Sequence, residues 1–181
     1  MFKLNINQPI YDPVAVQPMR DELIAAGFTE MPGPDDVERF LDIKDKTILV
    51  MINSVCGCAA GSARPGVTMA LQNSIIPDYL VTVFAGQDRE AVDYFRRIYL
   101  MGIPPSSPFI VIIKNDEILY MMQRHDIEGK SPEMVAEELV QAFDRYCNRK
   151  GPSISTEEYA NLQHAIMCGS KIPLAKQNNN Q

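Results

Sequence analysis

The chain has 181 residues, 46% of them hydrophobic, and a formal net charge of −6. That length favours one domain with an appendage, and the apolar fraction excludes wholesale disorder. The net negative charge argues against nucleic acid as the main partner. The chain begins Met1-Phe2-Lys3 and contains no apolar run suited to a signal peptide or a membrane span. We therefore expect a cytoplasmic protein without a membrane partner.

Two helices are predicted before the first strong strand. Pro18 suits the first turn of a helix that runs to about Ala26, with Gly27 as its stop. The breaker cluster at 31–34 then precedes a second helix over residues 35–43. We interpret both helices as an N-terminal extension of the fold.

The central part of the chain predicts a mixed β-sheet. The continuous apolar run 47–52 is typical of a strand buried on both faces of a parallel sheet. The elements expected after it are, in order, an Ala-rich helix over 59–72, a strand over 80–84, a helix after Asp88, a strand over 109–113, an Asn115-Asp116 turn, a strand over 117–123 and a helix opened by Ser131-Pro132. The βαβ order implies parallel strands, and the hairpin adds antiparallel ones. The predicted fold class is α/β, with a mixed four-stranded sheet flanked by helices, and its core spans residues 47–147.

The last part of the chain has a weaker pattern. Residues 155–158 predict a capping box before a short helix, and the Asn/Gln-rich end at 177–181 is of low complexity. We therefore expect one domain over 1–148 and a C-terminal extension over 149–181, a short helix followed by disorder. Deleting residues 170–181 should then leave the melting temperature nearly unchanged.

Two cysteines separated by one glycine, Cys56-Gly57-Cys58, follow the buried strand and precede the Ala-rich helix. A thiol at a helix N-terminus faces unpaired N–H groups and the positive end of the helix dipole, and both favour the reactive thiolate. Cys56 comes first, so we expect it to be the more exposed and to attack, whereas Cys58 should face away from solvent. A disulfide between the two would close a ring with one intervening residue. We expect it to be strained and more oxidising than that of thioredoxin, which lies near about −270 mV.

Other cysteines and histidines could bind a metal or take part in the redox chemistry. The cysteine pair could bind a metal together with Cys147, Cys168, His125 or His164, although a structural zinc site usually shows two close pairs of ligands. Cys147 could have an auxiliary redox role, and His125 could be an exposed group or a proton carrier. Neither Cys168 nor His164 is assigned a role.

Arg64 lies about two helical turns after Cys56 and is followed by Pro65. Two interpretations of Arg64 stay open: a solvated helix residue, or a group that positions negative charges of the substrate. Pro65 is expected to kink the helix.

Several separated blocks occur in one order along the chain. They are Asn-Ser-Val-Cys-Gly-Cys-Ala-Ala-Gly at 53–61, Ala-Arg-Pro at 63–65, Val-Phe-Ala-Gly-Gln-Asp at 83–88, Pro-Ser-Ser-Pro at 105–108, Arg-His at 124–125 and Ile-Glu-Gly at 127–129. This arrangement resembles the bacilliredoxins, the Cys-Gly-Cys members of the thioredoxin superfamily. The resemblance runs from about Val16 to Cys147, implies a thioredoxin-like fold and does not cover residues 148–181.

The resemblance also implies a function. Bacilliredoxins are thiol–disulfide oxidoreductases that remove bacillithiol from protein mixed disulfides formed under oxidative stress. Cys56 would attack the bacillithiol sulfur, and Cys58 would be the resolving or modulating thiol. The implied partners are bacillithiolated proteins and bacillithiol or its reductase system, with bacillithiol as thiol co-substrate and no other cofactor. No oligomeric state is implied.

Pro108 has two interpretations. It could be an ordinary loop proline before a strand, where it costs no ladder hydrogen bond. The resemblance instead implies a cis Ser107–Pro108 bond, with backbone atoms beside Cys56. For the whole protein, two alternatives to the bacilliredoxin activity remain: a disulfide isomerase-like activity, and a metal-binding or redox-sensing interaction protein that uses Cys56 and Cys58 and binds its partner through the tail.

Overall fold

The computed structural model describes residues 7–176 and centres on one mixed β-sheet. Its five strands lie in the order β1-β4-β2-β5-β6. In chain order they are β1 (Thr29–Glu30), β2 (Ile48–Asn53), β4 (Tyr79–Phe84), β5 (Phe109–Lys114) and β6 (Glu117–Met122). β2 runs parallel to β4 and antiparallel to β5, so it is the central strand. A second, two-stranded sheet pairs β3 (Ile75–Ile76) with β7 (Arg149–Lys150).

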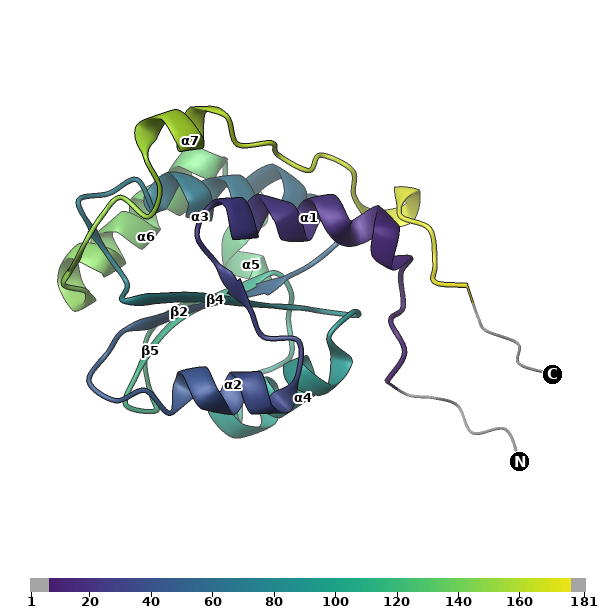
Figure 1. The fold of residues 1–181 in the computed structure, drawn as a ribbon, viewed down its shortest axis with the longest axis horizontal. Helices are drawn as coiled ribbons and strands as arrows, with labels where there is room; N and C mark the ends of the chain where they lie inside the picture. The colour runs from purple at the N-terminus through teal and green to yellow at the C-terminus, as the bar shows by residue number, and fades with distance from the viewer. Residues whose placement is uncertain (1–6, 177–181) are drawn as a thin grey trace.

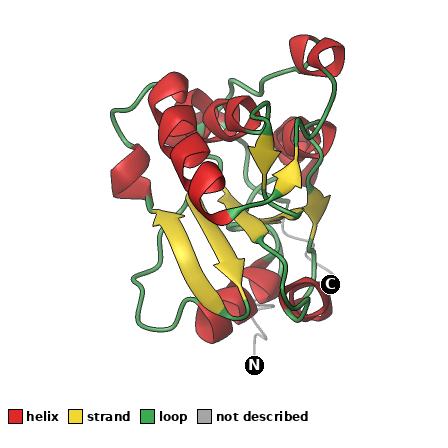
Figure 2. Cartoon of the chain, turned by 90° about the vertical axis from the view of Figure 1, so that its left-hand side faces the viewer, coloured by secondary structure: helices red, strands yellow, loops and turns green. Residues whose placement is uncertain are grey.

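Helices cover both faces of the five-stranded sheet (Figure 1). One face carries α1 (Pro13–Ala25), the π-helical segment η1 (Ala59–Ala63) with α3 (Arg64–Ala70), α6 (Pro132–Tyr146) and α7 (Thr156–Ala160). The other face carries α2 (Pro34–Leu41) and α4 (Arg89–Tyr99). The short elements α5 (Arg124–Ile127) and η2 (Gly169–Lys171) complete the chain. Figure 2 shows the same helical layers on either side of the strands. Within residues 7–176, no helix combines the length and the apolar character needed to cross a bilayer.

The central strand β2 supplies the core of both layers. All six of its residues are buried, and successive side chains point to opposite faces. Leu49 and Met51 belong to the cluster under α3 and α6, whereas Val50 and Ile52 belong to the cluster under α2 and α4. The continuous apolar run therefore produces a strand that is packed on both faces, and the cysteine pair follows directly after this buried strand.

The predicted α/β class with a mixed, thioredoxin-like sheet is confirmed, but the predicted strand number is wrong. The sheet has five strands because Thr29 and Glu30 pair in parallel with Val81 and Thr82 of β4. A two-residue strand is too short to show an alternating pattern, so its pairing depends on its neighbour. The short helix predicted after Ser155 is present as α7, with the expected capping box.

The predicted start of the first helix is also wrong. α1 begins at Pro13, and the carboxylate of Asp12 accepts a hydrogen bond from the Val14 N–H. Pro18 therefore lies inside the helix rather than in its first turn. Asp12 and Pro13 together form a complete helix start, an N-cap followed by proline, which the assignment to Pro18 overlooked. Gly27 ends the helix as expected, with φ of +101°.

Disorder was expected after the short helix, but the structure contradicts this for residues 161–176. Residues 173–175 hydrogen-bond the backbone near the N-terminus, through Asp12 N–H to Pro173 O and Ala175 N–H to Ile10 O. Ile172 is only 4% exposed and packs in a small cluster with Val55 and Phe84. A single anchoring residue shows no periodicity in sequence, which is why the pattern did not reveal the docking. The end at 177–181 lies outside the described residues.

The docked tail reverses the expected result of its deletion. Removing residues 170–181 should lower the melting temperature, because Ile172 and the two hydrogen bonds are lost. The substitution Ile172→Ala should cost about 2 kcal/mol, which corresponds to a fall of roughly 4–8 °C in melting temperature for a chain of this size. Leu174→Ala is the matched control, since Leu174 is 68% exposed and should stay within about 0.5 kcal/mol of the parent. Equal melting temperatures for the two variants, measured by circular dichroism, would show that the tail is not anchored.

A second stability prediction concerns the packing of α3 on α6. A Cβ on Gly66 would lie 2.7 Å from Val135 Cβ and 3.0 Å from Pro132 O. Gly66→Ala should therefore force the helices apart and cost about 1–3 kcal/mol. Gly61 is the control, because a Cβ there meets nothing within 4 Å. Gly61→Ala should leave the free energy of unfolding unchanged or raise it slightly. Urea titration of both variants measures the difference. A neutral Gly66→Ala would contradict this packing.

Candidate active site

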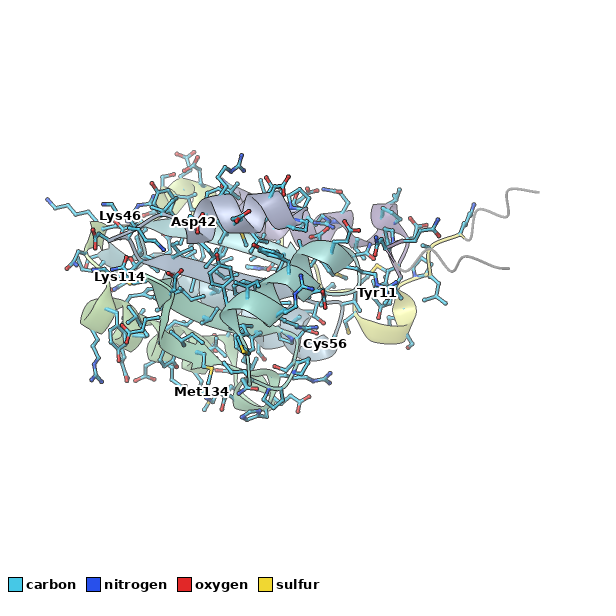
Figure 3. The ribbon with its side chains drawn as sticks, turned by 90° about the horizontal axis from the view of Figure 1, so that it is seen from below. Tyr11, Asp42, Lys46, Cys56, Lys114 and Met134 are labelled. Atoms are coloured by element: carbon cyan, nitrogen blue, oxygen red, sulfur yellow. The ribbon has the colours of Figure 1, made fainter. Side chains whose placement is uncertain are left out.

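The cysteine pair lies at the end of β2, just before η1, and Figure 3 labels Cys56. The Cys56 and Cys58 sulfurs are 2.8 Å apart, and both side chains are free thiols that are half-buried. Both thiols fall in the same partly exposed class, so the expectation that Cys56 is the more exposed of the two stays a prediction. What distinguishes the two thiols is the set of groups around each sulfur.

Cys56 is surrounded by backbone groups. Its sulfur accepts a hydrogen bond from the Ala59 N–H at 3.4 Å, and it lies 3.9 Å from the carbonyl oxygen of Ser107. The Cys56 N–H donates to Ser54 Oγ at 3.2 Å, which fixes the turn after the strand. An N–H in the first helical turn stabilises a thiolate better than a thiol, because the donor faces the negative charge. The Cys56 sulfur thus has one backbone N–H donor facing it and one carbonyl oxygen beside it.

The Ser107–Pro108 peptide bond is cis, as the resemblance implied. Pro108 is buried directly before β5, and the carbonyl of Ser107 faces the Cys56 sulfur. The loop before β5 therefore forms one wall of the site. Of the predicted supporting residues, the structure brings Gly57, Ser107 and Pro108 to the thiols.

The pKa of Cys58 is raised above its ordinary value. Its side chain packs partly against the core under α3 and α6, and this burial, with the neighbouring Cys56 thiol as the next cause, raises the pKa of Cys58 to about 11. The positive charge of Arg124 opposes this rise, and the negative charge of Glu128 adds to it. Burial thus disfavours the thiolate of Cys58.

Both predicted roles of Arg64 are wrong. The residue is completely buried, so it neither lies in solvent nor meets a substrate. Its guanidinium donates to Glu22 Oε2 at 2.8 Å, to Asn53 Oδ1 at 3.1 Å, to Ser54 O at 3.0 Å and to Ala165 O at 2.7 Å. A π-helical turn takes up one residue more than an α-helical turn, so η1 shifts the helix face that Arg64 occupies. Pro65 stands in the first turn of α3, directly after η1, and the kink expected there stays a prediction.

The buried Arg64 joins the active-site loop to α1 and the tail. Glu22 on α1 accepts hydrogen bonds from Arg64 and from the Ala165 N–H, and its second oxygen lies 2.7 Å from His164 Nδ1. Asn53 accepts from the Ser54 N–H at 2.8 Å and donates to Met19 O at 3.0 Å. Neither Glu22 nor Asn53 was predicted from the sequence as part of the site. Glu22 could have been found, because it lies on the buried stripe of α1 between Met19 and Leu23.

The other candidate residues, His125, Cys147 and Cys168, lie at different positions relative to the cysteine pair. His125 has a 70% exposed side chain beside Asp126, and within residues 7–176 no hydrogen bond joins it to either thiol. Cys147 is buried, its pKa is raised by that burial to about 11, and it lies near Thr47, at the opposite end of β2 from Cys56. Cys168, by contrast, lies close to Gly57. In the part of the chain that the structure describes, no three His, Cys, Asp or Glu side chains are grouped to hold a metal ion.

Comparison with known proteins shows the family to which this sequence is related. The sequence profile of a family described as "Disulphide isomerase" matches residues 11–147. A bacilliredoxin of Salinibacter ruber is 48% identical over 143 residues, which cover 78% of this chain and 83% of that protein. This chain belongs to the bacilliredoxin family. Bacilliredoxins of Geobacillus kaustophilus and Staphylococcus aureus are 51% and 42% identical, over 73% and 81% of this chain and 91% and 100% of their own lengths.

Membership in the bacilliredoxin family confirms the resemblance and gives the chain a thiol–disulfide redox role. The family profile ends at residue 147, where α6 gives way to the tail. His164, Ala165 and Cys168 therefore belong to a segment beyond the profile, although they contact the active-site loop or its supports.

Proposed function

We propose that this protein is a thiol–disulfide oxidoreductase that removes bacillithiol, or a similar low-molecular-weight thiol, from protein mixed disulfides in the cytoplasm. The observation that carries the proposal is the position of the Cys56 sulfur. It accepts a hydrogen bond from the Ala59 N–H at the start of a helical segment and lies beside the Ser107 carbonyl. Cys56 follows the end of β2 and is partly exposed to solvent. One thiolate in such a position is sufficient for the first exchange step.

The first step exchanges one disulfide for another. The Cys56 thiolate attacks the bacillithiol sulfur of the mixed disulfide, a new S–S bond forms, and the substrate protein leaves as a thiolate. Bacillithiol is then held on Cys56 as a mixed disulfide. A second thiol, from this chain or from another bacillithiol molecule, releases it, and a bacillithiol reductase system would restore the reduced state. Bacillithiol is the only co-substrate in this scheme.

Two other activities use the same thiols. A disulfide isomerase activity is favoured by the description of the matching family and by the pair of thiols 2.8 Å apart. A metal-binding or redox-sensing protein would use the same pair to bind an ion. A thiol titration with and without a zinc chelator separates the metal-binding protein, because only that protein would carry stoichiometric zinc and gain thiols on chelation.

The test is a single-turnover reaction with a defined substrate. A protein with one bacillithiol mixed disulfide is mixed with an equal amount of the reduced chain, and both are weighed by intact-protein mass spectrometry. We expect the substrate to lose one bacillithiol and regain its free thiol. The same substrate with a glutathione or coenzyme A adduct shows which low-molecular-weight thiol is preferred. If no adduct is removed but a protein with scrambled disulfides is refolded, the isomerase activity is the correct one.

A further inference from the structure

The C-terminal tail places a third thiol beside the cysteine pair. A Cβ built on Gly57 would lie 3.8 Å from the sulfur of Cys168. The neighbouring Gly169 N–H donates to Val55 O at 2.6 Å, so residues 168 and 169 run against residues 55–57. Figure 3 shows the tail passing the end of the molecule at which Cys56 is labelled. Cys168 is a free, half-buried thiol.

The tail is fixed on both sides of Cys168. Before it, Ala165 hydrogen-bonds Arg64 and Glu22, which are both buried. After it, Ile172 is buried with Val55. Between these anchors the chain is exposed, with Ile166 83% accessible. Cys168 thus lies in a short, surface-exposed segment that cannot diffuse away from the active site, which makes its effective concentration there high.

We propose that Cys168 is the resolving thiol of this active site. The proposal rests on the function proposed above, because it concerns the step after bacillithiol has been transferred to Cys56. The Cys168 thiolate attacks the Cys56 sulfur, the Cys56–bacillithiol S–S bond breaks, and bacillithiol leaves as a thiolate. A Cys56–Cys168 disulfide forms in its place. Across both steps the substrate disulfide gains two electrons and the Cys56–Cys168 pair loses two, so no outside oxidant is needed, and a dithiol or two low-molecular-weight thiols regenerate the pair.

The chemistry of Cys58 makes it a poor alternative for this step. A Cys56–Cys58 disulfide would close a ring with one intervening residue, which resists the dihedral angle near ±90° that a disulfide prefers. Burial, with Cys56 and Glu128 acting in the same direction and Arg124 against them, also keeps the Cys58 thiol protonated at neutral pH. A disulfide between Cys56 and Cys168 would close a long loop and avoid the small ring.

The test uses the full chain with Cys58→Ser, so that the two possible resolving thiols are separated. This variant receives one equivalent of bacillithiol from a mixed-disulfide protein, and acid quenching is followed by peptide mapping. We expect free bacillithiol and a Cys56–Cys168 disulfide. Cys58→Ser/Cys168→Ser should instead retain bacillithiol on Cys56. Cys58→Ser/Cys147→Ser is the matched control and should behave like Cys58→Ser, because Cys147 is buried near the other end of β2.

The outcomes separate this proposal from the proposed function. If Cys58→Ser and Cys58→Ser/Cys168→Ser hold the adduct equally long, Cys168 does not resolve it, while the first transfer stands. A disulfide from Cys168 to a second chain would also overturn the proposal. If no variant takes up bacillithiol, the proposed function itself fails.

An independent test measures the rate of bacillithiol release as a function of pH. It compares the parent chain with Cys168→Ser, both of which retain Cys58. In Cys168→Ser, with no free bacillithiol added, bacillithiol leaves through Cys58, whose pKa is raised to about 11 by burial and by Cys56 and Glu128, against Arg124. Its release rate should therefore rise about tenfold per pH unit between roughly pH 7 and 9. The parent chain should be at least about tenfold faster at pH 7. Equal rates for the two chains at pH 7 would overturn the proposal.

Discussion

Replacement of Cys56 by serine is expected to abolish the removal of bacillithiol from a mixed-disulfide protein. A serine hydroxyl ionises far less readily than a thiol and cannot form a disulfide, so no covalent intermediate can form at this position. Cys58 is not expected to replace Cys56 at neutral pH, because burial raises the pKa of Cys58 and disfavours its thiolate. The transfer rate should fall to that of the exchange without enzyme, a loss of at least about a thousandfold.

Cys147→Ser serves as the control for the loss of a thiol elsewhere in the chain. Cys147 is buried near the opposite end of β2 from the Cys56 loop, so the variant should transfer bacillithiol at the rate of the parent. Melting temperatures of both variants show whether folding is intact. Full activity of Cys56→Ser in a folded chain would exclude Cys56 as the attacking thiol.

The largest expected effect on stability follows from breaking the buried ion pair of Arg64 and Glu22. Both side chains have no solvent exposure. Arg64→Met keeps the length of the side chain but leaves the Glu22 carboxylate without its charged partner, and Ser54 O and Ala165 O lose a donor. Removing one partner of a buried pair costs about 3–5 kcal/mol, because the other charge stays buried and unpaired. Urea unfolding at neutral pH measures this loss.

A second arginine and a double variant control for this effect. Arg39 pairs with Asp36 on the surface of α2, and its side chain is 66% exposed. Arg39→Met should change the unfolding free energy by less than about 1 kcal/mol. Arg64→Met combined with Glu22→Leu should be more stable than Arg64→Met alone, since no unpaired charge remains. If Arg64→Met is as mild as Arg39→Met, Arg64 does not have the structural role assigned to it.

Features defined by neighbouring residues could be predicted from the sequence. The apolar run that forms β2 identified the central strand, and Ser131-Pro132 identified the start of α6, where the Ser131 hydroxyl accepts the Met134 N–H. Asn115 and Asp116 both adopt positive φ, as a two-residue hairpin turn requires. In each case the physical cause lies within a few residues of the element.

Features that depend on distant partners could not be predicted. Arg64 is buried only because Glu22, far away in the sequence, supplies the opposite charge. The tail docks through Ile172, one apolar residue whose partners are Val55 and Phe84. The cysteine pair itself was found because its two thiols are adjacent in sequence, whereas Cys168 reaches Gly57 only through the folded tail.

The measurement that tests the central claim most directly is the mass of one trapped intermediate. The chain with Cys58→Ser and Cys168→Ser is mixed with an equal amount of a bacillithiolated protein, quenched in acid, digested and weighed. We predict one bacillithiol on the peptide that contains Cys56 and one free thiol on the substrate. A bacillithiol found on Cys147, or a substrate that loses its adduct while Cys56 stays unmodified throughout the reaction, would contradict the assignment of Cys56 as the attacking thiol.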